Sequence, residues 1–270
     1  MDNVTFDYFN VDDIPRECIC LFILILIIIG YYLLSSNTSK IPKVIYQTYK
    51  DKNVPPIVKE RWLQLNPGYE YHLYDDADCY QFLLDYYDKE HADFFKYKIK
   101  DGPIKSDFWR VCILYQFGGI YADIDIKPLV PIDEFVNSDT AFYTCLDIGH
   151  LSNNYIQNLN PHFIAVTPKN DILLKLINYY MNHIKKISYS YNSYSITGAL
   201  THIFEMYNLK IDKEGIYYVD GQIIQISQEI CPNGCYNDTS CSECYIEQDS
   251  KRIMDNRDGE IYTAVSHEFK

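Results

Sequence analysis

The stretch FGGIYADIDI, residues 117–126, constrains the fold of this chain more than any other segment. Four apolar side chains alternate with other residues along it: Ile120, Ala122, Ile124 and Ile126. This alternation is typical of a β-strand, in which side chains two residues apart point to the same face. Asp123 and Asp125 would then project from one face, and Pro128 would end the strand. Because a bare carboxylate pair is unfavourable in a protein core, these residues require a partner that neutralises them.

A shared metal cation is the partner that best explains Asp123 and Asp125. Two residues apart on a strand, the carboxylates would lie about 6–7 Å apart and repel each other. Their oxygens suit hard ions such as Mg²⁺, Mn²⁺ or Ca²⁺, and the open coordination positions suit a pyrophosphate. The alternative is an acidic pair in a solvated loop. A ligand site is favoured because Gly118 and Gly119 allow a tight turn or close approach to a ligand, and α/β sheets bind ligands at strand ends.

The segments before this stretch alternate between strand and helix patterns. Strands are predicted over residues 43–49 and 69–75, which are rich in β-branched and aromatic residues. Helices are predicted between Pro55 and Pro67, over 76–87 and over 103–117. The last of these has one apolar face: Ile104, Phe108, Val111, Cys112 and Tyr115. This order of elements favours an α/β sheet with helices on its faces.

The helix predicted over residues 103–117 also carries two charged side chains on one side. Asp107 and Arg110 are three residues apart, so they can meet. A surface ion pair, which contributes little to stability, is one interpretation, and a functional pair is the other. Gly118 suits the C-terminal cap of this helix.

The charge balance excludes some classes of partner. The formal net charge is −13, with 24 Lys and Arg against 37 Asp and Glu. Nucleic-acid binding requires a basic surface, so no nucleic-acid partner is expected. A phosphorylated substrate would need a metal ion to reach so acidic a protein. The sequence also contains no P-loop, dinucleotide-binding glycine motif, H-E-x-x-H or G-x-S-x-G.

Three segments resemble glycosyltransferase family 32, the DXD sugar-binding transferases: IPKVIYQTYKD, NPGYEYHLYDD and IKSDFWRVCILYQFGGIYADIDIKPL. The resemblance covers residues 41–134 and continues more weakly through 151–157 and 195–204. It implies a GT-A fold, that is, a Rossmann-like mixed sheet flanked by helices. It also implies a UDP- or GDP-sugar donor, Mn²⁺ or Mg²⁺ as cofactor, and retention of anomeric configuration.

Carried over by position, the resemblance implies a set of catalytic residues. Asp123 and Asp125 match the motif that binds the metal and the pyrophosphate. Asp107 and Arg110 match contacts to the donor sugar. The expected donor-binding site adds three residues around the same motif: Gly118, Gly119 and Tyr121.

Other positions match the family less closely. The first-strand motif usually reads His-Gln-x-Trp, and here it reads Tyr46-Gln47-Thr48-Tyr49, so Tyr49 is expected to stack on the nucleotide base. Asn153 and Asn154 match an asparagine beside the donor or acceptor sugar. His267 is a candidate contact to the metal or phosphate, and a surface histidine on the tail is the alternative.

Residues 18–34 form an uncharged apolar run, long enough as a helix to reach roughly 25 Å. We interpret residues 1–17 as a tail, 18–34 as an uncleaved transmembrane signal-anchor, 35–40 as a short stem and 41–270 as one catalytic domain. A signal peptide is disfavoured by the acidic residues before the run and by the missing A-x-A-like site. A core helix is disfavoured because the run has no polar face.

The orientation in the membrane has two interpretations. Four lysines follow the apolar run, at Lys40, Lys43, Lys50 and Lys52. They favour a cytosolic domain by the positive-inside rule. The sequons at Asn37 and Asn237 and the clustered cysteines favour a lumenal one. We expect a single-pass protein with its domain in an ER- or Golgi-type lumen, and the cytosolic orientation stays open.

A cysteine-rich loop is predicted over residues 231–244, with four cysteines: Cys231, Cys235, Cys241 and Cys244. Disulfides, a zinc site and free thiols are the possible interpretations, and disulfides are the simplest for a lumenal loop. Three other cysteines lie among apolar residues and are expected to be buried packing thiols: Cys79, Cys112 and Cys145.

The function expected from the sequence is metal-dependent, retaining transfer of a sugar to a glycan, glycoprotein or glycolipid acceptor at the membrane. One rival is a membrane protein that binds a sugar or nucleotide without catalysis. A second rival is a structural membrane protein stapled by cysteines, which would bind no nucleoside diphosphate.

Overall fold

The computed structural model describes residues 21–23, 25–26, 40–147, 158–182, 196–231 and 244–256. The chain divides into two units, Met1–Thr38 and Ser39–Lys270, and the fold below is that of the second. Among the described residues, no helix is both long and apolar enough to cross a membrane. Most of the anchor predicted over residues 18–34 and the whole predicted tail lie outside the described residues.

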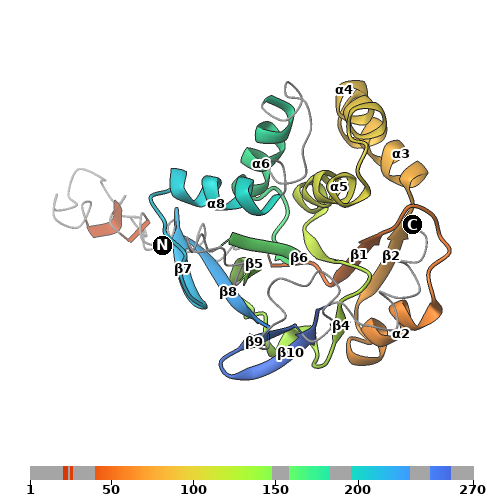
Figure 1. Cartoon of the computed structure of the whole chain (residues 1–270). Helices are drawn as coiled ribbons and strands as arrows, with labels where there is room; N and C mark the ends of the chain where they lie inside the picture. The colour runs from red at the N-terminus through yellow and green to blue at the C-terminus, as the bar shows by residue number, and fades with distance from the viewer. Residues whose placement is uncertain are drawn as a thin grey trace, which may run out of the picture. The chain divides into compact units, whose positions relative to one another are not determined.

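A mixed sheet of ten strands forms the centre of the second unit (Figure 1). The strand order is β2-β1-β3-β6-β5-β8-β9-β10-β4, and β7 pairs with β8. The strands are β1 (Val44–Thr48), β2 (Glu70–Tyr74), β3 (Gly119–Ala122), β4 (Lys127–Pro128), β5 (Thr140–Asp147), β6 (Asn158–Val166), β7 (Gly215–Val219), β8 (Gln222–Ile230), β9 (Tyr245–Gln248) and β10 (Lys251–Asp255). Strands β1, β2 and β3 are parallel, and β6 runs antiparallel to both β3 and β5.

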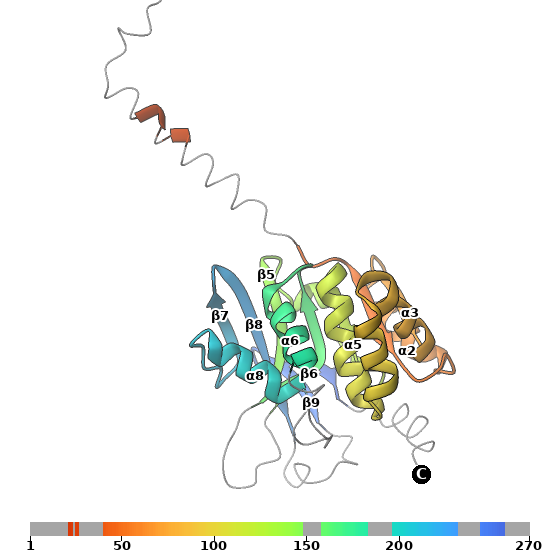
Figure 2. The ribbon, with the colours of Figure 1, turned by 90° about the horizontal axis from the view of Figure 1, so that it is seen from above.

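The helices are α2 (Pro56–Leu65), α3 (Asp76–Tyr86), α4 (Lys89–Asp93), α5 (Gly102–Phe117), α6 (Asp171–Asn182) and α8 (Ile196–Met206), with the π-helix η2 (Phe94–Lys98) and the 3₁₀-helix η3 (Ile132–Glu134). Helices α5, α6 and α8 lie on one face of the sheet, and α2 and the β9–β10 hairpin lie toward the other (Figure 1). Figure 2 shows α6 beside both α5 and α8.

Each face of the sheet has its own hydrophobic core. Phe108, Leu114 and Leu173 belong to the core under α5 and α6. Trp62 and Met254 belong to the core on the other side. The predicted α/β class is therefore confirmed, with a mixed sheet covered on both faces.

Helix α5 confirms the helix predicted over residues 103–117. Tyr115 of the predicted apolar face is partly buried, and the other four members are completely buried: Ile104, Phe108, Val111 and Cys112. The helix ends at Gly118, whose N–H donates to the carbonyl of Leu114 over 2.8 Å. Burial extends further round α5 than the apolar pattern predicts, because Asp107 and Arg110 are buried as well.

The strand predicted through Asp123 and Asp125 is shorter than expected. β3 ends at Ala122, and the next four residues form a turn in which Ile126 N–H donates to the Asp123 carbonyl over 3.2 Å. The prediction that both carboxylates lie on one face of a strand is wrong. The alternation of apolar residues arises instead because the turn buries Ile124 and Ile126 in two different clusters.

Gly118 and Gly119 are explained by the path of the chain between α5 and β3. Their φ angles are +65° and +101°, which non-glycine residues rarely adopt. A Cβ on Gly118 would lie 2.6 Å from the Pro168 nitrogen, and one on Gly119 would lie 2.7 Å from Val44 Cγ1. Both positions therefore combine a tight turn with close packing of neighbouring backbone.

One predicted disulfide is present. Cys231 follows β8 and Cys244 precedes β9, and the two sulfurs are bonded. The disulfide interpretation is thus confirmed for this pair, while Cys235 and Cys241 lie outside the described residues. The expected packing thiols are buried: Cys79, Cys112 and Cys145.

We predict that Gly119→Ala lowers the free energy of unfolding by at least about 2 kcal/mol, because it combines backbone strain with overpacking against Val44. Urea denaturation followed by circular dichroism measures this. Gly198→Ala is the control, since Gly198 lies in α8 with open space around its Cα, and the change should be neutral or stabilising by up to about 1 kcal/mol. Equal effects of the two substitutions would contradict this explanation of Gly119.

Candidate functional site

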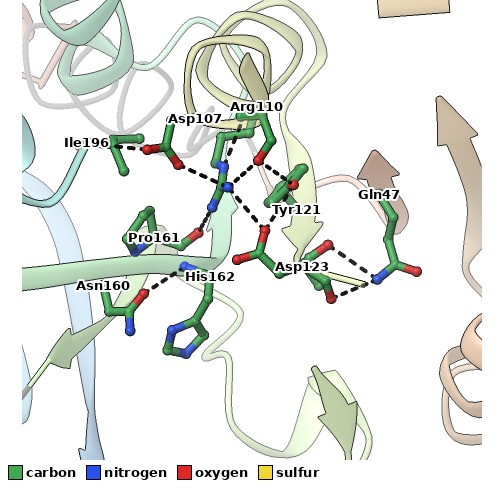
Figure 3. Close-up of polar contacts among 11 residues, drawn as sticks. Gln47, Asp107, Arg110, Tyr121, Asp123, Asn160, Pro161, His162 and Ile196 are labelled. Carbon is green, nitrogen blue, oxygen red and sulfur yellow. Dashed lines mark hydrogen bonds and ion pairs between the residues drawn. The ribbon is translucent and has the colours of Figure 1, made fainter. Parts of the chain in front are cut away.

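Arg110 of α5 lies at the centre of a buried polar cluster (Figure 3). Its side chain is 3% exposed. Nε donates to the Ser106 carbonyl over 3.2 Å, Nη1 donates to the Pro161 carbonyl over 2.7 Å, and Nη2 donates to Ser106 Oγ over 2.5 Å. The same Nη2 lies 3.0 Å from Asp107 Oδ1 and 3.1 Å from Asp123 Oδ1. The interpretation of Asp107 and Arg110 as a surface ion pair is therefore wrong.

The single guanidinium of Arg110 pairs with two carboxylates, those of Asp107 and Asp123. Burial raises the pKa of Asp107 from 3.8 to about 6, against the opposing effect of Arg110 and with a further contribution from Asp123. Burial also raises the pKa of Asp123, although Arg110 and Tyr121 oppose this. The pKa of Arg110 is raised above its ordinary value: burial alone would lower it, but Asp123, Tyr121 and Asp107 outweigh that effect. The cluster therefore carries excess negative charge.

Asp123 is the more accessible of the two carboxylates. Its side chain is 31% exposed, against 11% for Asp107. The hydroxyl of Tyr121 donates to Asp123 Oδ1 over 3.0 Å, and the Tyr121 ring lies under the guanidinium of Arg110, 4.3 Å from centroid to Cζ. Asp125 is half-buried in the same turn. Accessible carboxylate oxygens with an excess of negative charge fit a hard divalent cation.

The main chain of Asp123 is held from both neighbouring strands. Its N–H donates to the His162 carbonyl on β6 over 2.8 Å. Its carbonyl accepts from Gln47 Nε2 on β1 over 3.0 Å, as does the carbonyl of Ala122 over 3.2 Å (Figure 3). Since β1, β2 and β3 are parallel, the turn lies at their common C-terminal edge, where ligands bind in open α/β sheets.

Asp107 connects this cluster to α8. The N–H of Ile196, the first residue of α8, donates to Asp107 Oδ2 over 3.4 Å. A carboxylate near a helix N-terminus interacts favourably with the unpaired N–H groups there. Asp107 thus links α5, α8 and, through Arg110, the end of β3 (Figure 3).

Tyr49, the expected base-stacking residue, lies one residue after β1. Its N–H donates to the Tyr74 carbonyl over 3.1 Å, and its side chain packs in a small cluster with Ile124 of the turn. The structure therefore brings Tyr49 to the edge of the sheet that holds Asp123.

The remaining predicted site residues are placed elsewhere or are not described. Gly118 and Gly119 lie at the opposite end of β3 from Asp123, packed against protein backbone. Asn153, Asn154 and His267 lie outside the described residues.

Sequence reasoning gave no role to Ser106 or His162, and it named Gln47 only as a member of the first-strand motif of the family that the chain resembles. Ser106 lies one helical turn before Arg110 on α5, so this contact is local. His162 reaches the turn from β6, far along the sequence, which no local pattern reveals. The sequence does contain one signal for Gln47, because an amide within the apolar strand VIYQT is unusual. It is completely buried, so it needs hydrogen-bond partners inside the protein.

The region that holds Asp107, Arg110, Asp123 and Asp125 is similar to known glycosyltransferases. Residues 57–142 match a family model described as "Glycosyltransferase sugar-binding region containing DXD motif". This part of the chain is similar to the sugar-binding region of these glycosyltransferases. In the structure this DXD region includes α5, β3 and the turn with Asp123 and Asp125, so the resemblance seen in the sequence is confirmed.

Curated relatives match part of this chain. Mannosyl phosphorylinositol ceramide synthase SUR1 of Saccharomyces cerevisiae is 33% identical over 118 residues, which are 40% of this chain and 30% of that protein. An initiation-specific alpha-1,6-mannosyltransferase of Candida albicans is 31% identical over 41% of this chain and 31% of that protein. The chain thus spans about a third of the length of these curated relatives.

A larger part of the chain is similar to a protein named "Uncharacterized glycosyltransferase L373" of Acanthamoeba polyphaga mimivirus. It is 24% identical over 76% of this chain and 80% of that protein. Among solved structures, a protein titled "PaToxG Glycosyltransferase" aligns with a TM-score of 0.47 and 15% identity, over 62% of this chain and 70% of that one.

We predict that Asp107→Asn changes how stability depends on pH. The pKa of Asp107 is about 6 in the folded state and near 3.8 when unperturbed, so the folded state takes up this proton first as pH falls. The wild type should therefore gain stability relative to Asp107→Asn between pH 7 and pH 4, by about 2 kcal/mol.

Urea denaturation at several pH values measures this difference. Asp139→Asn, at an exposed position, is the control and should follow the wild type at every pH. A difference between wild type and Asp107→Asn that stays constant with pH would contradict the prediction.

Proposed function

We propose that this chain is a metal-dependent, retaining glycosyltransferase that moves a sugar from a nucleoside-diphosphate donor to an acceptor hydroxyl. The observation that carries the proposal is the position of Asp123 and Asp125 in a turn at the C-terminal edge of the sheet, beside a cluster with excess negative charge. The match of this same region to the DXD sugar-binding family supports the assignment. The mixed sheet agrees with the GT-A type that the resemblance implies.

The cofactor in this proposal is Mn²⁺ or Mg²⁺, held by Asp123 and Asp125. When bound, such an ion neutralises the charge that develops on a diphosphate leaving group as the glycosidic bond breaks. The exposed fraction of Asp123 leaves part of its carboxylate available for this role. His267, which lies outside the described residues, remains a candidate third contact.

Arg110 acts in this proposal by positioning. Its guanidinium donates to Ser106 and Pro161 and pairs with the carboxylates of Asp107 and Asp123. It thereby orients both carboxylates and limits their repulsion. Asp107 and Tyr121 complete this support, and Tyr49 at the same edge is positioned to stack on the nucleotide base.

The acceptor in this proposal is a glycolipid at a membrane, with a glycan or glycoprotein as the alternative. Mannosyl phosphorylinositol ceramide synthase and inositol phosphoceramide mannosyltransferase are named for transfer to a sphingolipid, and both match this chain. Their names also make mannose the first sugar to test. The apolar run at residues 18–34 would hold the domain close to the bilayer.

We predict that the full chain binds UDP or GDP in a manner that depends on Mn²⁺. Isothermal titration calorimetry with each nucleotide, with and without Mn²⁺, tests this and identifies the base. Metal-dependent binding together with transfer from the matching nucleotide-sugar supports an enzyme. Binding without transfer or donor hydrolysis would show a sugar-nucleotide-binding protein, and the absence of binding would leave the structural role of a cysteine-stapled membrane protein.

We predict that Asp125→Asn reduces the rate of sugar transfer or donor hydrolysis by about 100-fold or more, because it removes a negatively charged oxygen from the cation site. Release of UDP or GDP from the donor at saturating Mn²⁺ measures the rate. Asp139→Asn removes an exposed carboxylate elsewhere and should leave the rate unchanged. A fully active Asp125→Asn variant would overturn the assignment of Asp125 to the cation.

A further inference from the structure

Gln47 of β1 has no part in the function described above, yet its side chain contacts the turn that follows β3, residues 123–126, directly. It is completely buried, with an exposed fraction of 0%. Its Nε2 donates to the carbonyls of Ala122 and Asp123, over 3.2 Å and 3.0 Å (Figure 3). Its Oε1 accepts from the hydroxyl of Tyr71 on β2 over 2.7 Å. Both N–H groups and the oxygen of the amide therefore have partners inside the protein.

The position of this amide follows from the way β3 ends. The pairing of β1 with β3 includes Ile45 with Ile120 and Tyr46 with Tyr121. One residue further along, Gln47 faces Ala122, the last residue of β3. The described pairing of the two strands ends at Tyr46 and Tyr121. Beyond them, the side-chain amide of Gln47 donates to the main-chain carbonyls of Ala122 and Asp123. Gln47 thus extends the contact between the two strands into the turn.

The turn is held from β6 as well. Asp123 N–H donates to the His162 carbonyl over 2.8 Å, and the Asp123 carbonyl accepts from Ile126 N–H as well as from Gln47. The position of the main chain sets the position of the Cα and Cβ atoms from which a side chain extends. The location of the Asp123 carboxylate therefore depends on these hydrogen bonds. Among them, the bonds from Gln47 come from a side chain, so they can be removed by substitution without changing the backbone.

Tyr71 fixes which way the amide points. The oxygen and the NH₂ group of glutamine have nearly the same shape, so hydrogen-bond partners decide the orientation. The Tyr71 hydroxyl donates to Oε1, and this directs both N–H groups toward the carbonyls of Ala122 and Asp123. The pKa of Tyr71 is raised by burial, so this hydroxyl keeps its proton.

We propose that Gln47 is a positioning residue for the cation site, and that Tyr71 supports it. By fixing the turn that follows β3, the pair would hold Asp123 and Asp125 in the arrangement that binds a divalent cation. Outer-shell partners of this kind tune metal affinity by about 10–100-fold. The inference rests on the proposed function, because it concerns the same two carboxylates.

The test compares Mn²⁺ affinity with thermal stability in the full chain. Gln225→Met is the matched control, because Gln225 is also a buried amide that donates to a carbonyl, that of Phe135, and accepts from Thr140 Oγ1. It lies on β8, which is separated from β3 by β6 and β5. Mn²⁺ binding in the presence of UDP or GDP is followed by electron paramagnetic resonance, and melting temperature is measured without metal.

Gln47→Met should weaken Mn²⁺ binding by about tenfold or more, and Tyr71→Phe by a smaller factor of about three. Gln225→Met should lower the melting temperature by a similar amount to Gln47→Met while leaving Mn²⁺ affinity unchanged. If Gln47→Met does not fold, Tyr71→Phe decides the question by the same measurement.

The outcomes separate this inference from the proposed function. Failure of the wild type to bind Mn²⁺ overturns the proposed function, and the role given to Gln47 falls with it. Wild-type binding with unchanged affinity in Gln47→Met, or in Tyr71→Phe if that variant has to decide, overturns the role of Gln47 alone. An equal loss of Mn²⁺ affinity in Gln225→Met also overturns it, because the effect would then follow general destabilisation.

Discussion

The sharing of one guanidinium between two carboxylates is the interaction on which the site depends. Arg110 pairs with Asp107 on its own helix and with Asp123 after β3. A single positive charge cannot neutralise two carboxylates, one buried and one half-buried, so the cluster favours a proton or an added cation. The same side chain also donates to the Pro161 carbonyl, and Asp107 accepts from the N-terminus of α8. Two helices and two strands are therefore held together at a cluster that carries excess negative charge.

The Asp123 carboxylate lies at an accessible edge of the sheet because the short strand β3 ends just before it. β3 contains only Gly119–Ala122, and the turn after it leaves the sheet between β1 and β6. Because β1, β2 and β3 are parallel, side chains that follow them gather at one edge. The close packing that requires glycine lies at the other end of β3, at Gly118 and Gly119. The two glycines and the carboxylates of the candidate site therefore lie at opposite ends of the same strand.

Much of the first half of the fold could be predicted because its apolar residues recur at clear helical or strand spacing. The apolar spacing of Ile104, Phe108 and Val111 locates α5, and the β-branched residues of 43–49 locate β1. The end of β3 could not be predicted, because Ile124 and Ile126 continue an apparent alternation while they pack in different clusters of a turn. The burial of Arg110 and the roles of Gln47 and His162 depend on contacts between distant elements. Local pattern carries no information about such contacts. Helical spacing and the resemblance to a family pointed to Asp107 and Arg110 as a pair, but not to the burial of Arg110.

The bond between Cys231 and Cys244 closes a loop directly across two neighbouring strands, since Ile230 and Tyr245 next to it are paired in β8 and β9. The last strands of the sheet are consequently attached to the rest of the chain twice, once by peptide bonds and once by sulfur. A protease that cut between the two cysteines would produce fragments that remain one molecule until a reductant is added. Epitopes or tags inserted in that interval would likewise leave β9 and β10 anchored.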